Sequence, residues 1–286
     1  MSIKGIWIPV VTPFKDGEVD FKSYERLIKR YVDSGVTGIM PLATTGETPT
    51  LSEVEYERIL EKSMEITEGK ISVFVGLGGN NTKAVIEKLK VAEKHKVQGI
   101  LSVTPYYNRP DQRGIYEHFN NISNNTDLDI ILYNIPYRTG RNIENETLIK
   151  LAENKNIVGV KDASGNFNQT IDLLMNKPDN FSVLTGEDLY FYNSLLLGGD
   201  GGIMASAHLR TEEFVKVYKL IQNNDYKSAL NIWRDISKII PKLFKEPNPS
   251  PIKYLLAKEG LIDSPEVRLP LVEISDKLKD ELNKMI

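Results

Sequence analysis

Short apolar segments alternate with amphipathic segments along most of the chain, and this alternation constrains the fold more than any other feature of the sequence. Eight of the apolar segments are short and rich in Val and Ile, and most end at Gly, Pro, Asn or Thr, as strands do. They cover residues 5–14, 38–42, 71–77, 99–103, 129–133, 157–160, 181–184 and 201–204. Each is followed by a segment with helical periodicity, which predicts repeated strand–helix units in a parallel sheet.

The segments with helical periodicity carry start signals typical of helices. The clearest periodicity lies in segments 21–33, 54–66 and 83–94. Thr50-Leu-Ser-Glu53 resembles a capping box, in which a hydroxyl and a carboxylate satisfy the first amides of a helix. Asn80-Asn-Thr and Thr211-Glu-Glu place capping and acidic residues at two other predicted helix starts.

Eight strand–helix units can close into a (β/α)8 barrel or form an open, doubly wound sheet. The open sheet usually carries a Gly-rich phosphate-binding turn after its first strand, whereas the first strand here ends in Val11-Thr-Pro-Phe. We therefore predict an α/β fold, a TIM barrel spanning residues 1–224. The strand signal stops near Asn224, and helices predicted at 226–245, 251–259 and 271–285 form a C-terminal helical extension over residues 225–286.

Composition excludes several functional classes. The formal net charge is −3 without a basic block, which argues against a nucleic-acid partner. The chain has no cysteine, so neither a disulfide framework nor a thiolate nucleophile is possible. Neither a signal-peptide pattern nor an apolar stretch long enough to cross a membrane is evident. We expect a cytoplasmic enzyme without membrane contact.

Lys161 is the most unusual residue in the sequence. It follows the apolar run Ile157-Val-Gly-Val at the end of the sixth predicted strand, and active sites of barrels lie at the carboxyl ends of their strands. Burial disfavours an ammonium ion and so produces a neutral amine that can attack a ketone. The alternative is a lysine that has left the barrel and points into solvent, but the central position of the strand favours a nucleophile.

Other strand ends carry polar residues that suggest a site without deciding its chemistry. Tyr133 and Arg138 follow the fifth strand, where a phenol could relay protons and a guanidinium could bind a carboxylate; singly, each could be a packing or surface residue. Thr44-Thr45-Gly46-Glu47 closes the second strand, and its hydroxyls and amides could bind a carboxylate. Tyr106-Tyr107 follows the fourth strand, although paired tyrosines usually serve packing.

The remaining motifs predict neither a metal nor a cofactor. The three histidines, His95, His118 and His208, lack metal-ligand spacing and are expected to be ordinary surface or packing residues. Gly76-Leu-Gly-Gly79 lacks the Lys-Ser/Thr of a phosphate-binding loop and is interpreted as a tight turn.

Taken together, these segments resemble the dihydrodipicolinate synthase/N-acetylneuraminate lyase family of pyruvate-dependent class I aldolases over essentially the whole chain. The resemblance rests on five motifs in order: Thr44-Thr-Gly-Glu47, Tyr106-Tyr-Asn108, Tyr133-Asn-Ile-Pro-X-Arg-Thr-Gly140, Gly159-Val-Lys-Asp-Ala-Ser-Gly165, and Asn248-Pro-Ser-Pro together with Arg268-Leu-Pro-Leu. The form around Tyr133 and Arg138 resembles the dihydrodipicolinate synthase branch.

The resemblance implies a reaction and a role for each site residue. Lys161 is expected to form an imine with pyruvate without any cofactor, and the enamine to condense with L-aspartate 4-semialdehyde to 4-hydroxy-tetrahydrodipicolinate, on the route to lysine and diaminopimelate. The expected proton relay consists of Thr44, Tyr133 and Tyr107. The expected substrate-binding residues are Thr45 for the pyruvate carboxylate, Arg138 for the aldehyde's carboxylate, and Gly186 and the Ile203 carbonyl lining the pocket.

The resemblance also bears on alternatives, assembly and regulation. Ala43 replaces the usual glycine of the Thr44 motif, and Gly202-Ile-Met-Ala-Ser differs from the common eighth strand. An aldolase of a 2-keto-3-deoxy sugar acid, with the same fold and imine, therefore stays open, as does a catalytically inactive barrel that only binds.

Members are usually homotetramers, as pairs of dimers in which the residue at the position of Tyr107 acts across the dimer interface. Ala84 stands where lysine-inhibited members carry a glutamate, which predicts weak or no inhibition by L-lysine.

Overall fold

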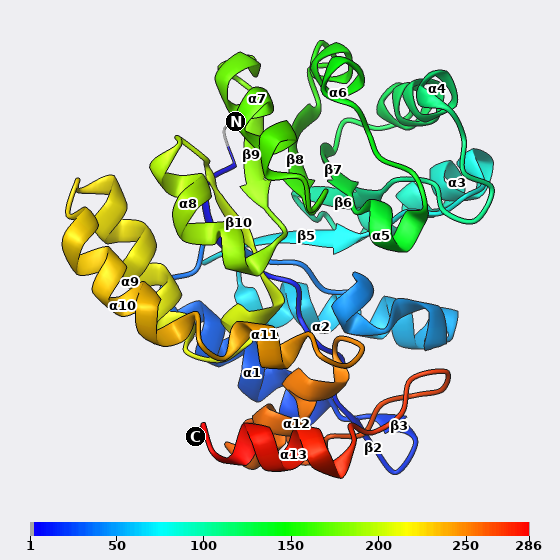
Figure 1. The fold of residues 1–286 in the computed structure, drawn as a ribbon. Coiled ribbons are helices and arrows are strands. Elements are labelled where there is room, and N and C mark those ends of the chain that lie inside the picture. Colours follow the sequence, from blue (N-terminus) through cyan, green and yellow to red (C-terminus); the bar gives the residue numbers. More distant parts are fainter. Residues whose placement is uncertain (1–2, 286) are drawn as a thin grey trace. The chain divides into compact units, whose positions relative to one another are not determined.

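The computed structural model describes residues 3–285, and eight parallel strands form a closed barrel within them (Figure 1). Around the barrel the strands follow the order β1, β10, β9, β8, β7, β6, β5, β4. These strands are β1 (Gly5–Ile8), β4 (Gly38–Ile39), β5 (Ser72–Gly76), β6 (Gly99–Val103), β7 (Asp129–Asn134), β8 (Ile157–Asp162), β9 (Ser182–Thr185) and β10 (Gly201–Ile203). Helices follow the strands along the chain, which confirms the predicted (β/α)8 barrel.

The chain forms two compact units, of which the first comprises residues 1–5 and 74–203. Its helices follow strands β5 to β9, and neighbouring helices pack against one another in chain order, α3 on α4, α4 on α6 and α6 on α7 (Figure 1). The helices of this unit are α3 (Thr82–Lys94), α4 (Gln112–Ser123), α5 (Pro136–Thr139), α6 (Asn145–Leu151), α7 (Phe167–Asn176), the 3-10 helix η3 (Asp188–Tyr190) and α8 (Phe191–Leu196).

The second unit comprises residues 6–73 and 204–286, so the C-terminal helices belong to the same unit as the first helices of the chain. In it α1 packs against α2 and α9, and α9 lies beside α10 (Figure 1). Its helices are α1 (Phe21–Ser34), η1 (Thr44–Gly46), η2 (Thr48–Thr50), α2 (Glu53–Thr67), η4 (Ala205–His208), α9 (Thr211–Gln222), α10 (Tyr226–Ile236), α11 (Ile240–Leu243), α12 (Ser250–Lys258) and α13 (Asp276–Asn283).

Close backbone approach explains a glycine at the start of β6. A Cβ atom on Gly99 would lie 2.3 Å from Cε1 of Phe74 in β5 and 2.4 Å from the carbonyl oxygen of Asp129 in β7. Neither contact is possible for a real side chain, so only glycine lets the Phe74 ring lie over this point of the sheet.

The predicted first strand, 5–14, was wrong beyond Ile8. Pro9 has no amide hydrogen to continue the ladder, and Phe14 instead belongs to a separate hairpin of β2 (Phe14–Lys15) and β3 (Glu18–Val19). Between these strands Asp16 and Gly17 have φ angles of 54° and 85°, the left-handed pair that a two-residue hairpin turn requires.

Three predictions about helix boundaries were also wrong. The capping box of α2 consists of Ser52 and Glu55, two residues later than the predicted Thr50 and Glu53, because the Thr50 hydroxyl donates to the Glu47 carbonyl instead. The predicted helix 226–245 is divided into α10 and α11, since Pro241 cannot continue a helix that arrives from its N-terminal side. The predicted helix 271–285 begins only at Asp276, where Ser275 caps α13.

Within residues 3–285, no helix combines the length and the apolar character that a membrane crossing requires.

Candidate active site

Lys161 lies inside β8, where its neighbours in register are Tyr133 of β7 and Leu184 of β9. Only 6% of the residue is exposed, and Nζ lies 4.3 Å from the centroid of the Tyr133 ring. Every residue of β8 is buried, so the strand places the amine where water is largely excluded. The structure therefore supports the buried lysine that the sequence predicts and excludes the solvent-exposed alternative.

Burial lowers the pKa of Lys161 to about 8. The positive charge of Arg138 contributes to this lower pKa, whereas the carboxylates of Asp188 and Glu187 raise it and oppose the effect of burial. At pH 7 such a group is neutral in roughly a tenth of the molecules, against about one in three thousand for an ordinary lysine. The first unit thus holds a substantial population of nucleophilic amine at neutral pH.

Tyr133 is an aromatic neighbour of that amine, and hydrogen bonds from Thr104 hold its backbone. Thr104 is fully buried and donates both its backbone N–H (3.0 Å) and its hydroxyl (2.9 Å) to the Tyr133 carbonyl. Burial raises the pKa of Tyr133, so the side chain remains a phenol at neutral pH. A phenol can both accept and donate a hydrogen bond, which suits a group that passes protons on without ionising by itself.

Gly186 follows β9 and lies directly against the lysine side chain. A Cβ atom on Gly186 would lie 2.7 Å from Cε and 2.8 Å from Cγ of Lys161, so any other residue would displace that side chain. The Gly186 amide donates to the Asp162 carbonyl at 2.7 Å. Gly186 therefore borders Lys161, and Ile203, also expected at the site, is fully buried in β10 of the same unit.

Arg138 lies in the short helix α5, which starts directly after β7 and Ile135. Its guanidinium carbon lies 5.0 Å from the centroid of the Tyr137 ring, and the residue is exposed. The charge of Arg138 lowers the pKa of both Lys161 and Tyr133. An exposed, permanently charged fork that acts on both groups is well suited to bind a substrate carboxylate.

Tyr107 lies in a strained turn after β6. The Asn108 amide donates to the Tyr106 carbonyl at 2.9 Å across Tyr107, whose φ is 70°, as in the rare γ-turn with positive φ. Asn80 stabilises the turn, since its side chain donates to the Tyr106 carbonyl and its own carbonyl accepts from Asn108. This turn leaves 91% of Tyr107 exposed, so the ring is presented to solvent rather than to the core.

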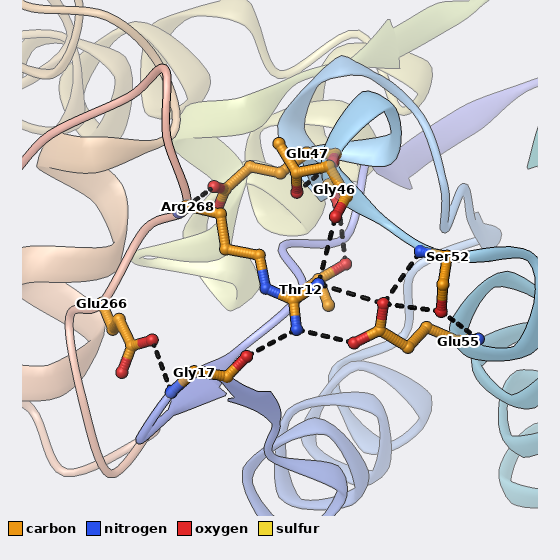
Figure 2. A network of polar contacts seen from close by, with 9 residues as sticks. Thr12, Gly17, Gly46, Glu47, Ser52, Glu55, Glu266 and Arg268 are labelled. Carbon is orange, nitrogen blue, oxygen red and sulfur yellow. Dashed lines mark hydrogen bonds and ion pairs between the residues drawn. The ribbon is translucent and has the colours of Figure 1, made fainter.

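In the second unit, Thr44 and Thr45 form the 3-10 turn η1 after β4. Thr45 is buried with 3% exposure, while Thr44 is half-buried. The turn is tied down at Gly46, whose carbonyl accepts the Thr12 hydroxyl at 2.8 Å (Figure 2). The turn that the sequence predicts after this strand is therefore confirmed.

Glu47 anchors the end of the same turn through a fully buried ion pair. Its Oε1 accepts from Lys253 Nζ at 2.7 Å, and neither side chain has any exposed surface. Its Oε2 accepts from the Arg268 backbone amide at 2.9 Å. Both carboxylate oxygens are thus satisfied from the C-terminal segment, which holds Glu47 in a left-handed conformation with φ of 52°.

Arg268 links this turn to the start of α2. Its guanidinium binds both carboxylate oxygens of Glu55, at 2.6 and 3.0 Å, and also donates to the Gly17 carbonyl (Figure 2). It donates to the Thr50 carbonyl as well. The hydrogen bonds from Arg268 lower the pKa of Glu55 to about 2. Sequence reasoning recognised Arg268-Leu-Pro-Leu as a family motif without assigning this role.

Within residues 3–285 two lysines, Lys161 and Lys253, are buried, and their surroundings differ. Burial lowers the pKa of Lys253 to about 8, as it does for Lys161, but Lys253 is paired with Glu47. Lys161 has no carboxylate within ion-pairing distance among residues 3–285. An unpaired amine is free to react, whereas a paired and wholly buried one serves structure.

The structure thus brings Lys161, Tyr133 and Gly186 together in the first unit and builds the threonine turn in the second. Sequence reasoning missed Asp188 and Glu187, which act on Lys161 through charge, and gave them no signal beyond their place after β9. It also missed Lys253, although a lysine within the apolar run Ile252-Lys-Tyr-Leu-Leu resembles the signal that identified Lys161.

The histidines have packing roles where the structure defines them. His208 is fully buried; its Nε2 accepts from the Val11 amide and its Nδ1 donates to the Ala205 carbonyl. Burial lowers the pKa of both His208 and His118 to about 4, so both rings are neutral at pH 7. Across residues 3–285, no group of three or more histidine, aspartate or glutamate side chains is placed to hold a metal ion.

Fold and site together define a (β/α)8-barrel protein with an unpaired, desolvated lysine inside its sixth barrel strand along the chain. The chain belongs to the dihydrodipicolinate synthetase family, whose model matches residues 2–286. The resemblance inferred from the five motifs is thereby confirmed.

Three known proteins illustrate what this chain is similar to. A 4-hydroxy-tetrahydrodipicolinate synthase 2 of Clostridium acetobutylicum is 62% identical over the full length of both chains. The crystal structure of dihydrodipicolinate synthase from Thermotoga maritima matches with a TM-score of 0.97 at 37% identity, over 100% of this chain and 98% of that one. The Acinetobacter baumannii enzyme in complex with pyruvate matches with a TM-score of 0.96 at 35% identity, over 99% and 98%.

The buried ion pair yields a stability prediction. Lys253→Met leaves the Glu47 carboxylate buried without its cation, which should lower the free energy of unfolding by about 3–5 kcal/mol in denaturant titrations. Adding Glu47→Gln removes the stranded charge and should restore part of the loss. Lys29→Met, which breaks the exposed Lys29–Glu25 pair on α1, is the matched control and should change stability little. Equal effects of the two lysine substitutions would contradict this account.

Proposed function

We propose that this protein is a 4-hydroxy-tetrahydrodipicolinate synthase, a lyase that condenses pyruvate with L-aspartate 4-semialdehyde in lysine and diaminopimelate biosynthesis. The observation that carries the proposal is Lys161, a buried and unpaired amine with a pKa of about 8 in a chain of this family. The 62% identical synthase of Clostridium acetobutylicum supports the same activity. We place the enzyme in the cytoplasm, where such biosynthesis takes place.

In the proposed reaction, neutral Lys161 attacks the ketone carbon of pyruvate and water leaves, which forms an imine. The imine withdraws electrons, so a proton leaves the pyruvate methyl group and the resulting enamine attacks the aldehyde carbon. Protons pass through the phenol of Tyr133, the centre of a relay with Thr44 and Tyr107. The electron sink is the covalent imine itself, so the reaction proceeds without a cofactor.

Two carboxylates need binding groups in this scheme. The Thr45 hydroxyl binds the carboxylate of pyruvate, a ligand for which the Acinetobacter baumannii relative provides a precedent. Arg138 binds the carboxylate of the semialdehyde through its planar fork. Gly186 and the Ile203 carbonyl line the pocket beside Lys161, and the contact between Gly186 and the lysine side chain supports that role.

The alternative of a 2-keto-3-deoxy sugar acid aldolase is not favoured. Its grounds were Ala43 and the altered eighth strand, and the relative that is 62% identical over its whole length is a 4-hydroxy-tetrahydrodipicolinate synthase. A catalytically inactive barrel is disfavoured by the unpaired amine of Lys161. A buried lysine without a partner lowers the stability of the fold, so a catalytic role explains its presence better than a structural one.

Borohydride reduction tests the imine. Pyruvate plus borohydride should leave a stable secondary amine on Lys161, located by peptide mass analysis, and Lys161→Ala should show none. Because burial lowers the pKa of Lys161 to about 8, half of the amine is neutral near pH 8, so the trapping rate should climb between pH 6 and 8 and level off above about pH 9. An adduct on Lys253, or a rate that keeps rising towards pH 10, would contradict the assignment.

Arg138→Ala tests the binding of the second substrate. Loss of a charged hydrogen-bonded pair should lower kcat/KM for the semialdehyde about ten- to a hundredfold, while pyruvate still forms the imine. Because the Arg138 charge lowers the pKa of Lys161, the trapping midpoint should also move to higher pH in this variant. Normal efficiency with the semialdehyde would point instead to a sugar-acid substrate, which a panel of keto-deoxy acids would identify.

We further propose a homotetramer of paired dimers in which Tyr107 completes the relay of the neighbouring subunit. A tyrosine ring that is 91% exposed on a strained turn is a natural group for a second copy of the chain to cover.

Mixed assemblies test the role of Tyr107. Tyr107→Phe and Lys161→Ala chains, each inactive alone, should regain partial activity when they are unfolded and refolded together, since one site of each hybrid dimer has both groups. Refolding each variant by itself is the control. A fully active monomer by sedimentation, or hybrids without activity, would refute the shared site.

A further inference from the structure

Asn248 reaches the threonine turn from the segment that precedes α12. Its Nδ2 donates a hydrogen bond to the Thr45 hydroxyl oxygen at 3.0 Å, across 203 residues of sequence. Both residues are buried, Thr45 with 3% and Asn248 with 9% exposure. Sequence reasoning recognised Asn248 as part of a family motif but gave it no role.

The direction of this hydrogen bond determines what Thr45 can do. A threonine hydroxyl has a single proton to donate and can accept through its lone pairs. Since the Asn248 amide donates, the Thr45 oxygen acts as acceptor here and its own proton stays available to another group. An asparagine in the reverse orientation, or an aspartate, would accept that proton and consume it.

A second feature of Asn248 is an open hydrogen-bond acceptor. The Oδ1 atom of Asn248 is buried and makes no hydrogen bond within the described part of the chain. Buried polar atoms are nearly always paired, so this oxygen is open to a water molecule or a ligand next to Thr45.

The surrounding network leaves the pair little freedom. Glu47, two residues after Thr45, accepts hydrogen bonds from the Lys253 side chain and the Arg268 amide. Like Asn248, which binds Thr45, both residues lie in the C-terminal segment. The C-terminal segment therefore holds the turn both at the Thr45 hydroxyl and two residues later at Glu47.

We propose that Asn248 is a positioning residue for pyruvate, which fixes the Thr45 hydroxyl as a donor to the substrate carboxylate. This inference rests on the proposed function of Thr45. Asn248 acts through Thr45, so it should affect pyruvate binding rather than the chemical steps. A contact that is equally strong in the ground state and the transition state changes KM and leaves kcat unaltered.

Substitution in the full-length enzyme tests this role. Asn248→Ala should raise the KM for pyruvate about three- to tenfold, the range for one neutral hydrogen bond. The nearly isosteric Asn248→Asp should raise it more, because a carboxylate accepts the Thr45 proton and repels the pyruvate charge. In both, kcat and the KM for the semialdehyde should stay within about twofold of wild type.

Ser250→Ala is the matched control. Ser250 lies two residues after Asn248, is equally buried, and its hydroxyl makes no hydrogen bond within residues 3–285. This variant should leave the pyruvate KM unchanged, and its thermal unfolding midpoint serves as the reference for the Asn248 variants.

A double-mutant cycle separates positioning from general structural support. In a Thr45→Val background, Asn248→Ala should cause no further rise in pyruvate KM, because the hydroxyl that it positions is gone. Additive effects, or an Asn248→Asp enzyme with the wild-type KM, would overturn the inference. Wild-type enzyme that traps no pyruvate on Lys161 would overturn the proposed function instead, before any Asn248 variant is compared.

Discussion

The loss of water around the Lys161 amine is the constraint on which the rest of the site depends. An ammonium ion at 6% exposure loses most of its hydration, and no carboxylate lies close enough to replace it within the described residues. The result is a pKa of about 8, balanced between burial and Arg138 on one side and Asp188 and Glu187 on the other. These charges tune the amine without neutralising it, which keeps it available as a nucleophile.

The contrast with Lys253 shows that burial alone does not make a catalytic lysine. Both amines are desolvated, and the pKa of each is lowered to about 8. The Nζ atom of Lys253 forms an ion pair with Glu47 at 2.7 Å and lies 4.2 Å from the centroid of the Phe14 ring. What distinguishes Lys161 is the absence of such a partner among residues 3–285, together with its place inside a barrel strand beside Tyr133.

The sequence predicted the barrel and its buried lysine because both depend on local pattern. β-Branched runs and periodic helices are visible within a dozen residues, and Lys161 directly follows such a run. The hairpin at Phe14 was missed because the largely apolar run continues beyond Pro9 to Phe14, which conceals the end of the strand at Ile8. The bonds of Asn248 and Lys253 could not be predicted, since they join residues 203 and 206 positions apart, and nothing in either segment encodes its distant partner.

Those long-range hydrogen bonds give the C-terminal segment a structural role at the threonine turn. From the sequence the C-terminal helices are an extension that follows the barrel, yet they belong to one compact unit with residues 6–73. Three residues of this segment donate hydrogen bonds to the turn from Thr45 to Glu47: Asn248 to Thr45, and Lys253 and Arg268 to Glu47. Because Glu47 adopts an unfavourable left-handed backbone and carries a buried charge, the turn would not be stable without this segment. The tail is thus part of the machinery that shapes the threonine turn, and a change far along the chain can act on the site through it.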